Sequence, residues 1–174
     1  MLDTGFRSPL TTSAGRLFDA VASLLDLRQR SSFEAQAAMK LEYVADPDVR
    51  DAYPVEVTGS LEGLMVDWGP TIHAVLDDSC RGTDASIVSA RFHNAMVQAI
   101  VEVARAVAEP TVALSGGCFQ NRLLTERARQ RLMDAGFRVL VHRRVPANDG
   151  GISLGQVAVA AAQRILDGEQ VKGR

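Results

Sequence analysis

The sequence predicts an α/β fold in which helices pack on a mixed sheet. From Thr111 onward, short apolar segments alternate with longer amphipathic ones, the pattern of strands joined by helices. Before that point, apolar residues recur at helical spacing over residues 15–27 and 84–108. Hydrophobic residues make up 47% of the 174-residue chain and aromatic ones only 5%, which suits helices packed on a sheet. We therefore expect one domain with a sizeable core.

The first segments are predicted to be helical. After an irregular arm at residues 1–12, Ser13 or the threonine before it can cap a helix over residues 15–27. The sequence Ser-Ser-Phe-Glu at residues 31–34 is a capping-box pattern, because its serine and glutamate can each bond a free backbone N–H. It predicts a second helix that continues through Glu42.

The middle of the chain is predicted to form a small hairpin and two helices. Weak alternation around two glycines over residues 53–67 indicates the hairpin, and a short helix follows over residues 70–78. Asp84 or the preceding threonine caps the longest helix, which extends to about Ala108 before Pro110 ends it. Because the second half of this helix is apolar around most of its circumference, we expect other elements to cover it on two sides.

The C-terminal part carries the alternation that defines the fold class. We expect strand 111–115, helix 118–134 with Gly136 as its C-cap, strand 137–142, a helix from about Gly151 to Leu166, and a frayed tail at residues 167–174.

Composition argues against a membrane protein or a disulfide-bonded one. No apolar run reaches the roughly 18–20 residues needed to span a bilayer. The first 25 residues show no signal-peptide pattern. The two cysteines, Cys80 and Cys118, lack the spacing of a disulfide framework or a zinc ribbon. We therefore expect a cytoplasmic protein in a reducing environment.

Charge is distributed unevenly along the chain. Residues 1–110 hold 9 Lys/Arg against 16 Asp/Glu, and residues 111–174 hold 10 against 5, so the two parts carry −7 and +5. The basic part contains the glycine turns described next, which suits a polyanionic ligand. The alternative is a solvated helix face, since Arg127, Arg129 and Arg131 fall within one predicted helix.

The first candidate site is the Gly116-Gly117 turn between a strand and a helix. Glycines allow positive φ, and they leave room for a phosphate to reach the free N–H groups at the helix N-terminus. The turn lacks both the P-loop lysine and the GxGxxG pattern, so close packing is an equally physical explanation. Asn121 could bind a phosphate or a ribose, or it could cap the helix.

The second candidate site is Asp149, in the Asn-Asp-Gly-Gly turn at residues 148–151. Asp-Gly is a common turn sequence, yet this one follows a strand and precedes a helix, where ligands bind in α/β folds. The hypothesis therefore requires the two glycine turns to meet at the strand ends. A carboxylate there could add a metal ion, although one carboxylate cannot hold a hard cation alone.

Cys118 suggests a different hypothesis, a thiol enzyme. A cysteine at a helix N-terminus can have a lowered pKa and act as a nucleophile, with His73, His93 or His142 as general base. Small buried cysteines are common, and the structural role is favoured. His93, between a phenylalanine and an asparagine in the long helix, is expected to be packed or hydrogen-bonded rather than a ligand.

Several of these segments together resemble the hydrogenase-maturation carbamoyltransferases of the HypF type. They are Leu114–Leu124, Gly136-Phe137, Pro146 with Asn148–Gln156, Ser13–Val21, Phe33–Ala38 and Arg91–Asn94. The resemblance covers almost the whole chain. It implies the C-terminal lobe of an actin/sugar-kinase/Hsp70-like, or ribonuclease H-like, fold. It also implies an enzyme that makes carbamoyl adenylate from carbamoyl phosphate and ATP. The carbamoyl group then passes to the C-terminal cysteine of a partner maturation protein, which makes the cyanide ligand of the NiFe centre.

The resemblance also implies roles for particular residues. Gly116, Gly117 and Asn121 would bind the nucleotide, and Asp19 would contact its ribose. Asp149 would ligate a divalent metal such as Fe, Zn or Mg. No catalytic side chain is assigned, and neither a membrane nor a nucleic acid is expected as a partner.

Three departures from the family pattern limit these expectations. Position 118 is Cys where a branched aliphatic residue is expected, and position 35 is Ala where Gly is expected. The third is that the family's other domains, its upstream lobe and a His-x-x-x-His metal motif do not occur in this sequence. Residues 1–174 are therefore predicted to form a single partial domain, a fragment, truncated product or half of a split enzyme, inactive without the upstream lobe.

Two functional alternatives stay open, and so does the state of association. One alternative is a non-catalytic nucleotide-binding module, and the other is the related branch of tRNA threonylcarbamoyladenosine enzymes. Apolar surface left bare by an absent lobe would favour self-association.

Overall fold

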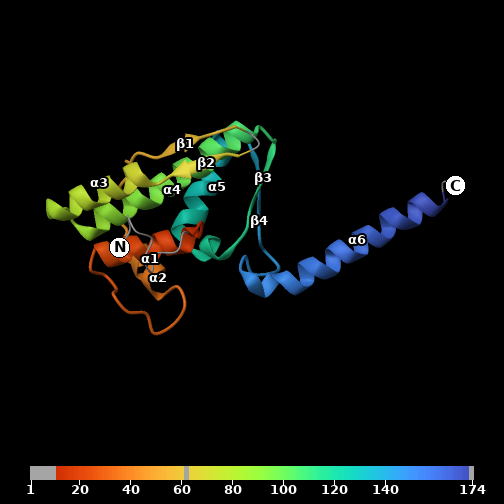
Figure 1. The fold of residues 1–174 in the computed structure, drawn as a ribbon, viewed down its shortest axis with the longest axis horizontal. Helices are drawn as coiled ribbons and strands as arrows, with labels where there is room; N and C mark the ends of the chain where they lie inside the picture. Colours follow the sequence, from red (N-terminus) through yellow and green to blue (C-terminus); the bar gives the residue numbers. More distant parts are fainter. Residues whose placement is uncertain (1–10, 61–62, 173–174) are drawn as a thin grey trace, which may run out of the picture.

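The structure is a computed structural model that describes residues 11–60 and 63–172 (Figure 1). Most of the predicted irregular arm, residues 1–12, lies outside the described residues. The elements in order are α1 (Ala14–Leu24), α2 (Gln36–Val44), β1 (Glu56–Thr58), β2 (Met65–Asp67), α3 (Gly69–Cys80), α4 (Ala85–Val107), β3 (Thr111–Leu114), η1 (Gly117–Gln120), α5 (Arg122–Asp134), β4 (Arg138–Val141), η2 (Asp149–Gly151) and α6 (Ile152–Lys172).

The α/β class is confirmed, but the described strands form two separate two-stranded sheets rather than one mixed sheet. β1 and β2 are the predicted antiparallel hairpin. β3 and β4 pair in parallel, with Thr111 opposite Arg138 and Leu114 opposite Val141. Because α5 connects these two strands, both reach their carboxyl ends at the same edge.

The long helix α4 organises the core. It packs against α2, α3, α5 and β1, which confirms the expected cover on two sides. Phe92 of α4 and Phe18 of α1 are buried and meet edge to face, with ring centroids 5.1 Å apart. Leu124 and Leu132 of α5 close the same cluster. The predicted cap is also present, because the Asp84 side chain accepts a hydrogen bond from the Ser86 N–H at 2.8 Å.

The predicted start of α2 is wrong. Residues 31–34 precede the helix, which begins at Gln36 after Ala35 takes a left-handed conformation with φ 60°. Among the described residues no side chain caps α2; the Gln36 side chain instead accepts the Ser32 N–H, ahead of the helix, at 2.9 Å. Ala35 occupies the position where the family pattern has glycine, and a positive φ is the conformation that favours glycine.

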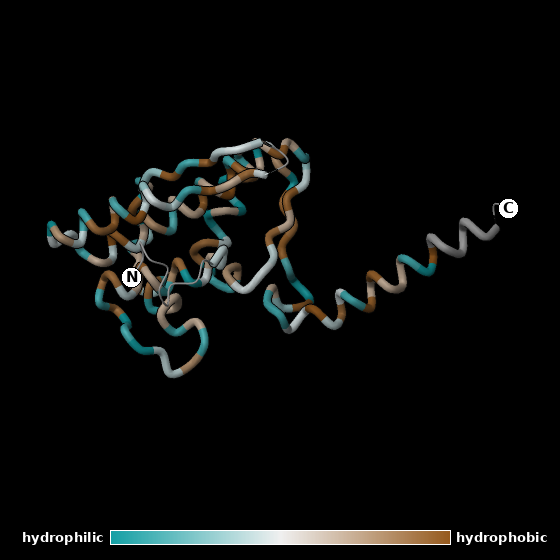
Figure 2. Tube along the Cα trace, viewed as in Figure 1, coloured by the Kyte–Doolittle hydropathy of each residue, from teal (hydrophilic) through white to brown (hydrophobic). Residues whose placement is uncertain are grey.

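The C-terminal helix α6 extends away from the rest of the molecule (Figure 1). It continues to Lys172 instead of ending near Leu166, so most of the predicted frayed tail is helical. Hydrophobic residues recur along this extended helix, where brown segments alternate with paler ones in Figure 2. Five of their side chains are exposed: Ile152, Leu154, Val157, Val159 and Ile165. Within the described part of the chain, no helix combines the length and the apolar character that a membrane crossing requires.

Candidate nucleotide site

The two glycine turns meet at the carboxyl ends of β3 and β4. The Gly116 N–H donates to the Ala147 carbonyl at 2.8 Å. Ser115 and His142 each follow the last residue of a strand, and His142 Nε2 lies 2.9 Å from Ser115 Oγ. The parallel pairing explains this proximity, because it places both strand ends at one edge. The spatial requirement of the sequence-based hypothesis is therefore met.

The first turn has the geometry that only glycine adopts readily. Gly116 has φ 105° and ψ 160°, a region essentially closed to residues with a Cβ atom. A methyl group added at Gly116 or Gly117 would meet no atom within 4 Å, so open space borders the turn. Among the described residues, no carbonyl accepts the backbone N–H of Gly117 or Cys118. The turn thus offers N–H donors beside a space that a ligand can enter.

The helix after this turn differs from the prediction. A short 3₁₀ segment, η1, follows the glycines, and α5 begins only at Arg122 rather than at residue 118. The first N–H groups of α5 are already bonded: those of Arg122 and Leu123 donate to Glu42 Oε1 at 2.7 and 3.3 Å. A phosphate at this site would therefore meet the N–H groups of the glycine turn and not those of α5.

Asn121 caps α5, one of the two roles considered for it. Its Oδ1 accepts the Leu124 N–H at 2.8 Å. Its Nδ2 lies 2.9 Å from Nε2 of His93, which is fully buried in α4. These contacts confirm the prediction that His93 is a hydrogen-bonded core histidine. A carboxamide has two N–H donors and two acceptor lone pairs, so Asn121 keeps one of each for a ligand.

A cavity of about 210 Å³ lies between the two turns. Its lining comes from β3, η1, α5 and the segment after β4: Leu114, Phe119, Gln120, Thr125, Val141, His142, Val145, Pro146 and Ala147. Pockets that enclose a whole small molecule usually measure roughly 300–1,000 Å³. This cavity is smaller than that range, and its lining does not include Gly116, Gly117, Asn121 or Asp149.

Asp149, the predicted metal ligand, is exposed at the start of η2. The turn is closed by its neighbour, since Asn148 Oδ1 accepts the Gly150 N–H at 3.1 Å. Residues 11–60 and 63–172 contain no group of three or more His, Cys, Asp or Glu side chains that could hold a metal ion. A single carboxylate does not make a site for a hard cation.

Asp19, the predicted ribose contact, lies on α1, a helix that packs against η1. Its carboxylate is 3.3 Å from Arg16 Nη1, one turn earlier on the same helix. Both side chains are partly exposed, so this ion pair is weak and easily exchanged for a ligand. The structure thus places Asp19 on an element beside the turn without a contact to it.

The thiol-enzyme hypothesis for Cys118 is not supported. The side chain is half-buried in η1 and packs against the core. Burial raises the pKa of the Cys118 thiol, whereas a nucleophilic cysteine needs a lowered pKa. The structural explanation is therefore favoured.

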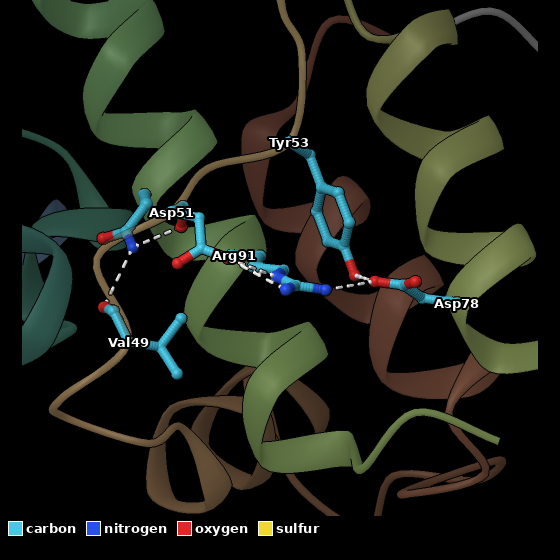
Figure 3. A network of polar contacts seen from close by, with 6 residues as sticks. Val49, Asp51, Tyr53, Asp78 and Arg91 are labelled. Atoms are coloured by element: carbon cyan, nitrogen blue, oxygen red, sulfur yellow. Dashed lines mark hydrogen bonds and ion pairs between the residues drawn. The ribbon is translucent and has the colours of Figure 1, made fainter. Parts of the chain in front are cut away.

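A polar network that the sequence did not reveal lies outside the site (Figure 3). Arg91 donates to Oδ2 of Asp51 and to Oδ2 of Asp78, each at 2.8 Å, and the Tyr53 hydroxyl donates to the same Asp78 atom at 2.7 Å. The Tyr53 hydrogen bond, with help from Arg91, holds the pKa of Asp78 below its ordinary value. This network fastens the loop before β1 to α3 and α4. In the sequence, the one indication of this network was that Arg91 belongs to the stretch Arg91–Asn94, which resembles the family pattern.

The arginines of α5 were predicted either to face a polyanionic ligand or to form a solvated helix face, and Arg127 does neither. It is half-buried, and it donates to Asn94 Oδ1 at 2.6 Å and to the Pro47 carbonyl at 2.9 Å. Arg129 and Arg131 are exposed, so the solvated-face explanation fits them. Arg127 instead joins α5 to the loop that precedes β1.

Comparison with known proteins identifies the relatives of this chain. A family model described as "Carbamoyltransferase, Kae1-like Domain, second subdomain" matches residues 1–156. Carbamoyltransferase HypF of Synechocystis sp. is 39% identical over 152 residues, which is 87% of this chain and 20% of that protein. Carbamoyltransferase HypF of Rhodobacter capsulatus is 40% identical over 164 residues, 91% of this chain and 21% of that protein.

The structural comparison agrees. A crystal structure of full-length HypF in the phosphate- and nucleotide-bound form matches with a TM-score of 0.77 and 38% sequence identity. The match covers 85% of this chain and 20% of that one. It confirms the ribonuclease H-like fold class. The chain thus spans about a fifth of the length of the relatives described here.

Proposed function

The chain belongs to the HypF carbamoyltransferase family, and we propose that it forms one wall of the nucleotide site of such an enzyme. The observation that carries this proposal is the junction of the two glycine turns, where Gly116 bonds Ala147 beside open space. The nucleotide is ATP, and then the carbamoyl adenylate formed from ATP and carbamoyl phosphate. The related HypF structure is in a phosphate- and nucleotide-bound form, which supports a nucleotide as the ligand.

The N–H donors of the first turn supply the chemistry. Gly116 fixes the bend, and the N–H groups of Gly117 and Cys118 bind the phosphate next to the ribose. When the carbamoyl group leaves, negative charge grows on that phosphate, and fixed N–H dipoles in a water-poor cleft stabilise it. Asn121 offers its remaining amide N–H to the nucleotide, and Asp19 leaves Arg16 to accept from the ribose hydroxyls.

The full reaction requires groups beyond the described residues. The carbamoyl group passes to the C-terminal cysteine thiol of a partner maturation protein, and the cyanide ligand of the NiFe centre is made from it. Asp149 contributes one oxygen ligand to a divalent metal, Fe, Zn or Mg, whose other ligands come from the enzyme's upstream lobe. Since the described residues alone do not fit a metal ion, no step on this chain is assigned to the metal.

Gly117→Ala tests the nucleotide wall directly. The added methyl group meets no protein atom, so the fold is expected to be unchanged while the methyl occupies the space beside the turn. Titration calorimetry of ATP with Mg²⁺ into the chain should show at least about tenfold weaker binding. Gly63→Ala, in the β1–β2 hairpin, is the matched control because its methyl group also meets no atom. Equal ATP affinity in the two variants would contradict the proposed wall.

Transfer activity tests the larger assignment. We expect the chain alone not to carbamoylate a peptide ending in cysteine, and we expect activity after addition of a separately expressed upstream lobe. Asp149→Ala should abolish that restored activity. Carbamoyl-phosphate- and ATP-dependent transfer by this chain alone would overturn the one-wall assignment. If the ATP affinity of the chain changes neither with Asp149→Ala nor on addition of the upstream lobe, the chain is a non-catalytic nucleotide-binding module.

A further inference from the structure

One buried side chain connects the core of the molecule to the candidate nucleotide turn. His93 is fully buried in α4, where its ring packs edge to face on Phe18 with centroids 5.4 Å apart. Its Nδ1 lies 2.8 Å from the Ser89 carbonyl oxygen, one turn earlier. A carbonyl oxygen only accepts, so Nδ1 carries the proton.

The protonated Nδ1 fixes the role of the other ring nitrogen. In a neutral ring, Nε2 must then be an acceptor, and the group facing it at 2.9 Å is the Asn121 amide. Asn121 therefore points its NH₂ at His93 and its oxygen at the Leu124 N–H, 2.8 Å away. One directed chain of donors thus runs from the Leu124 N–H at the start of α5 through Asn121 and His93 to the Ser89 carbonyl.

The surroundings keep this ring neutral. Burial is the main cause that lowers the pKa of His93 to about 4; the hydrogen bond to the Ser89 carbonyl opposes this shift, and the positive charge of Arg127 on α5 adds to it. The other groups that face the ring are uncharged: Phe18, Phe92, Ser89 and Asn121. A protonated ring would turn Nε2 into a donor opposite the donor of Asn121.

We propose that His93 is a positioning residue that fixes the Asn121 amide, and with it the turn over residues 115–121, in the orientation that binds the nucleotide. This inference rests on the function proposed above. His93 itself touches no nucleotide, since it lies behind the turn in the core. Its effect passes through Asn121, which keeps one N–H and one lone pair that its bonds to His93 and Leu124 do not use.

Two substitutions separate positioning from packing. In His93→Gln, the longer amide can place an oxygen where Nε2 accepts from Asn121. In His93→Asn, the shorter amide can replace only the Nδ1–H bond to Ser89. ATP affinity of the chain should stay within about threefold for Gln and fall at least about tenfold for Asn. Equal losses in both variants would mean that His93 acts by packing alone, which would overturn the inference.

Measurements without nucleotide keep the inference separate from the proposed function. Nitrogen-15 NMR of the unsubstituted chain should show the Nδ1–H tautomer of His93, and the Leu124 amide should exchange faster in His93→Asn than in His93→Gln. If the chain does not bind ATP, the proposed function fails, and these two readouts still decide the orientation of Asn121. An Nε2–H tautomer, or equal exchange in the two variants, would overturn the inference in either case.

Asn121→Asp gives a readout that a packing role would not move. The aspartate retains an oxygen to cap α5 but presents a second oxygen to His93 Nε2. The ring should then bind a proton, so NMR titration should show its pKa rising well above that of the unsubstituted chain. An unchanged His93 pKa would show that the Asn121 amide does not face this nitrogen.

Discussion

The two glycine turns of the candidate site are built in different ways. Residues 115–121 are held from the body of the molecule through Asn121, which contacts His93 of α4 and caps α5. Glu42 of α2 holds the adjoining start of α5, where it accepts from the N–H groups of Arg122 and Leu123. Residues 146–151 are closed mainly by their own bonds, in which the N–H groups of Gly150 and Gly151 donate to Oδ1 and the carbonyl oxygen of Asn148. Beyond the second turn, α6 extends outward with exposed hydrophobic side chains.

The difference indicates which half of the site the chain can prepare by itself. The first turn is fixed by side chains whose positions the core determines, so its N–H groups are oriented before a ligand arrives. The second turn depends on one backbone bond, from Gly116 to Ala147, for its place beside the first. Unequal support of this kind is consistent with the proposal that this chain forms one wall of a nucleotide site.

The largest expected effect comes from removing the core under the first turn. Phe92→Ala removes a fully buried ring that packs on Phe18, so unfolding free energy should fall by about 3–5 kcal/mol. Val157→Ala on α6 removes a side chain that is 66% exposed and should change stability by less than about 0.5 kcal/mol. Urea denaturation measures both. A similar cost for Val157→Ala would show that α6 is packed in solution, contrary to the comparison.

Acid should weaken the first turn next most strongly, through His93. Its pKa is lowered from 6.5 to about 4, so between these values the unfolded chain binds a proton that the folded chain does not. The stabilisation is therefore complete above pH 6.5 and is lost as pH falls toward about 4. The loss is on the order of 3 kcal/mol.

His93→Gln isolates this effect, because it has no titrating ring. The stability difference between neutral pH and about pH 4.5 should shrink in the variant relative to the unsubstituted chain. Lowered pKa values at Asp51, Asp78 and Asp84 act below this window and are common to both proteins. An identical pH profile in the two proteins would show that the His93 ring is not held neutral by its surroundings.

Much of the fold could be predicted because local signals and tertiary packing agree there. Asp84 caps α4, the hairpin forms, and Gly136 ends α5 with φ 90°, all from short-range patterns. The start of α2 could not be predicted in this way. The capping-box pattern pointed to Ser31–Glu34, whereas the bond that forms joins the Ser32 N–H to the side chain of Gln36. The prediction of a single mixed sheet was also wrong, because the periodicity of a strand does not indicate which strand it pairs with.

The candidate site also has features that the sequence predicted and features that it did not. Glycine turns at strand ends were visible in the sequence, and so was the possibility that Asn121 caps a helix. The capping of α5 by Glu42 was not visible, because the two partners lie 80 residues apart. The contact between His93 and Asn121 could not be predicted from a local pattern either, because it depends on how α4 packs on α5. Long-range side-chain bonds are set by packing, and a single sequence does not display them.

A substitution in each turn compares their backbones. Gly116→Ala forces a Cβ atom into φ 105°, ψ 160°, which should cost about 1–3 kcal/mol of unfolding free energy. Gly150→Ala has no such backbone demand, and its methyl would press on two side-chain atoms, Cγ of Pro146 at 3.1 Å and Oδ1 of Asn148 at 3.2 Å. We expect it to cost less than half as much by urea denaturation. Equal costs would mean that both turns depend equally on glycine, and the distinction between them would be lost.

The smallest effect tests whether α2 holds the start of α5, next to the first turn, by charge. Glu42→Gln retains an oxygen for the Arg122 and Leu123 N–H groups but removes the negative charge at the α5 N-terminus. The cost should be about 0.5–1 kcal/mol, the usual size of such a helix-dipole interaction. Glu126→Gln is the matched control, because its carboxylate pairs with Arg122 on the exposed surface of α5 and contributes only about 0.3–0.5 kcal/mol. Urea denaturation at low salt should therefore rank Glu42→Gln as the more costly change, whereas the reverse order would mean that hydrogen bonding alone, without charge, fastens α5 to α2.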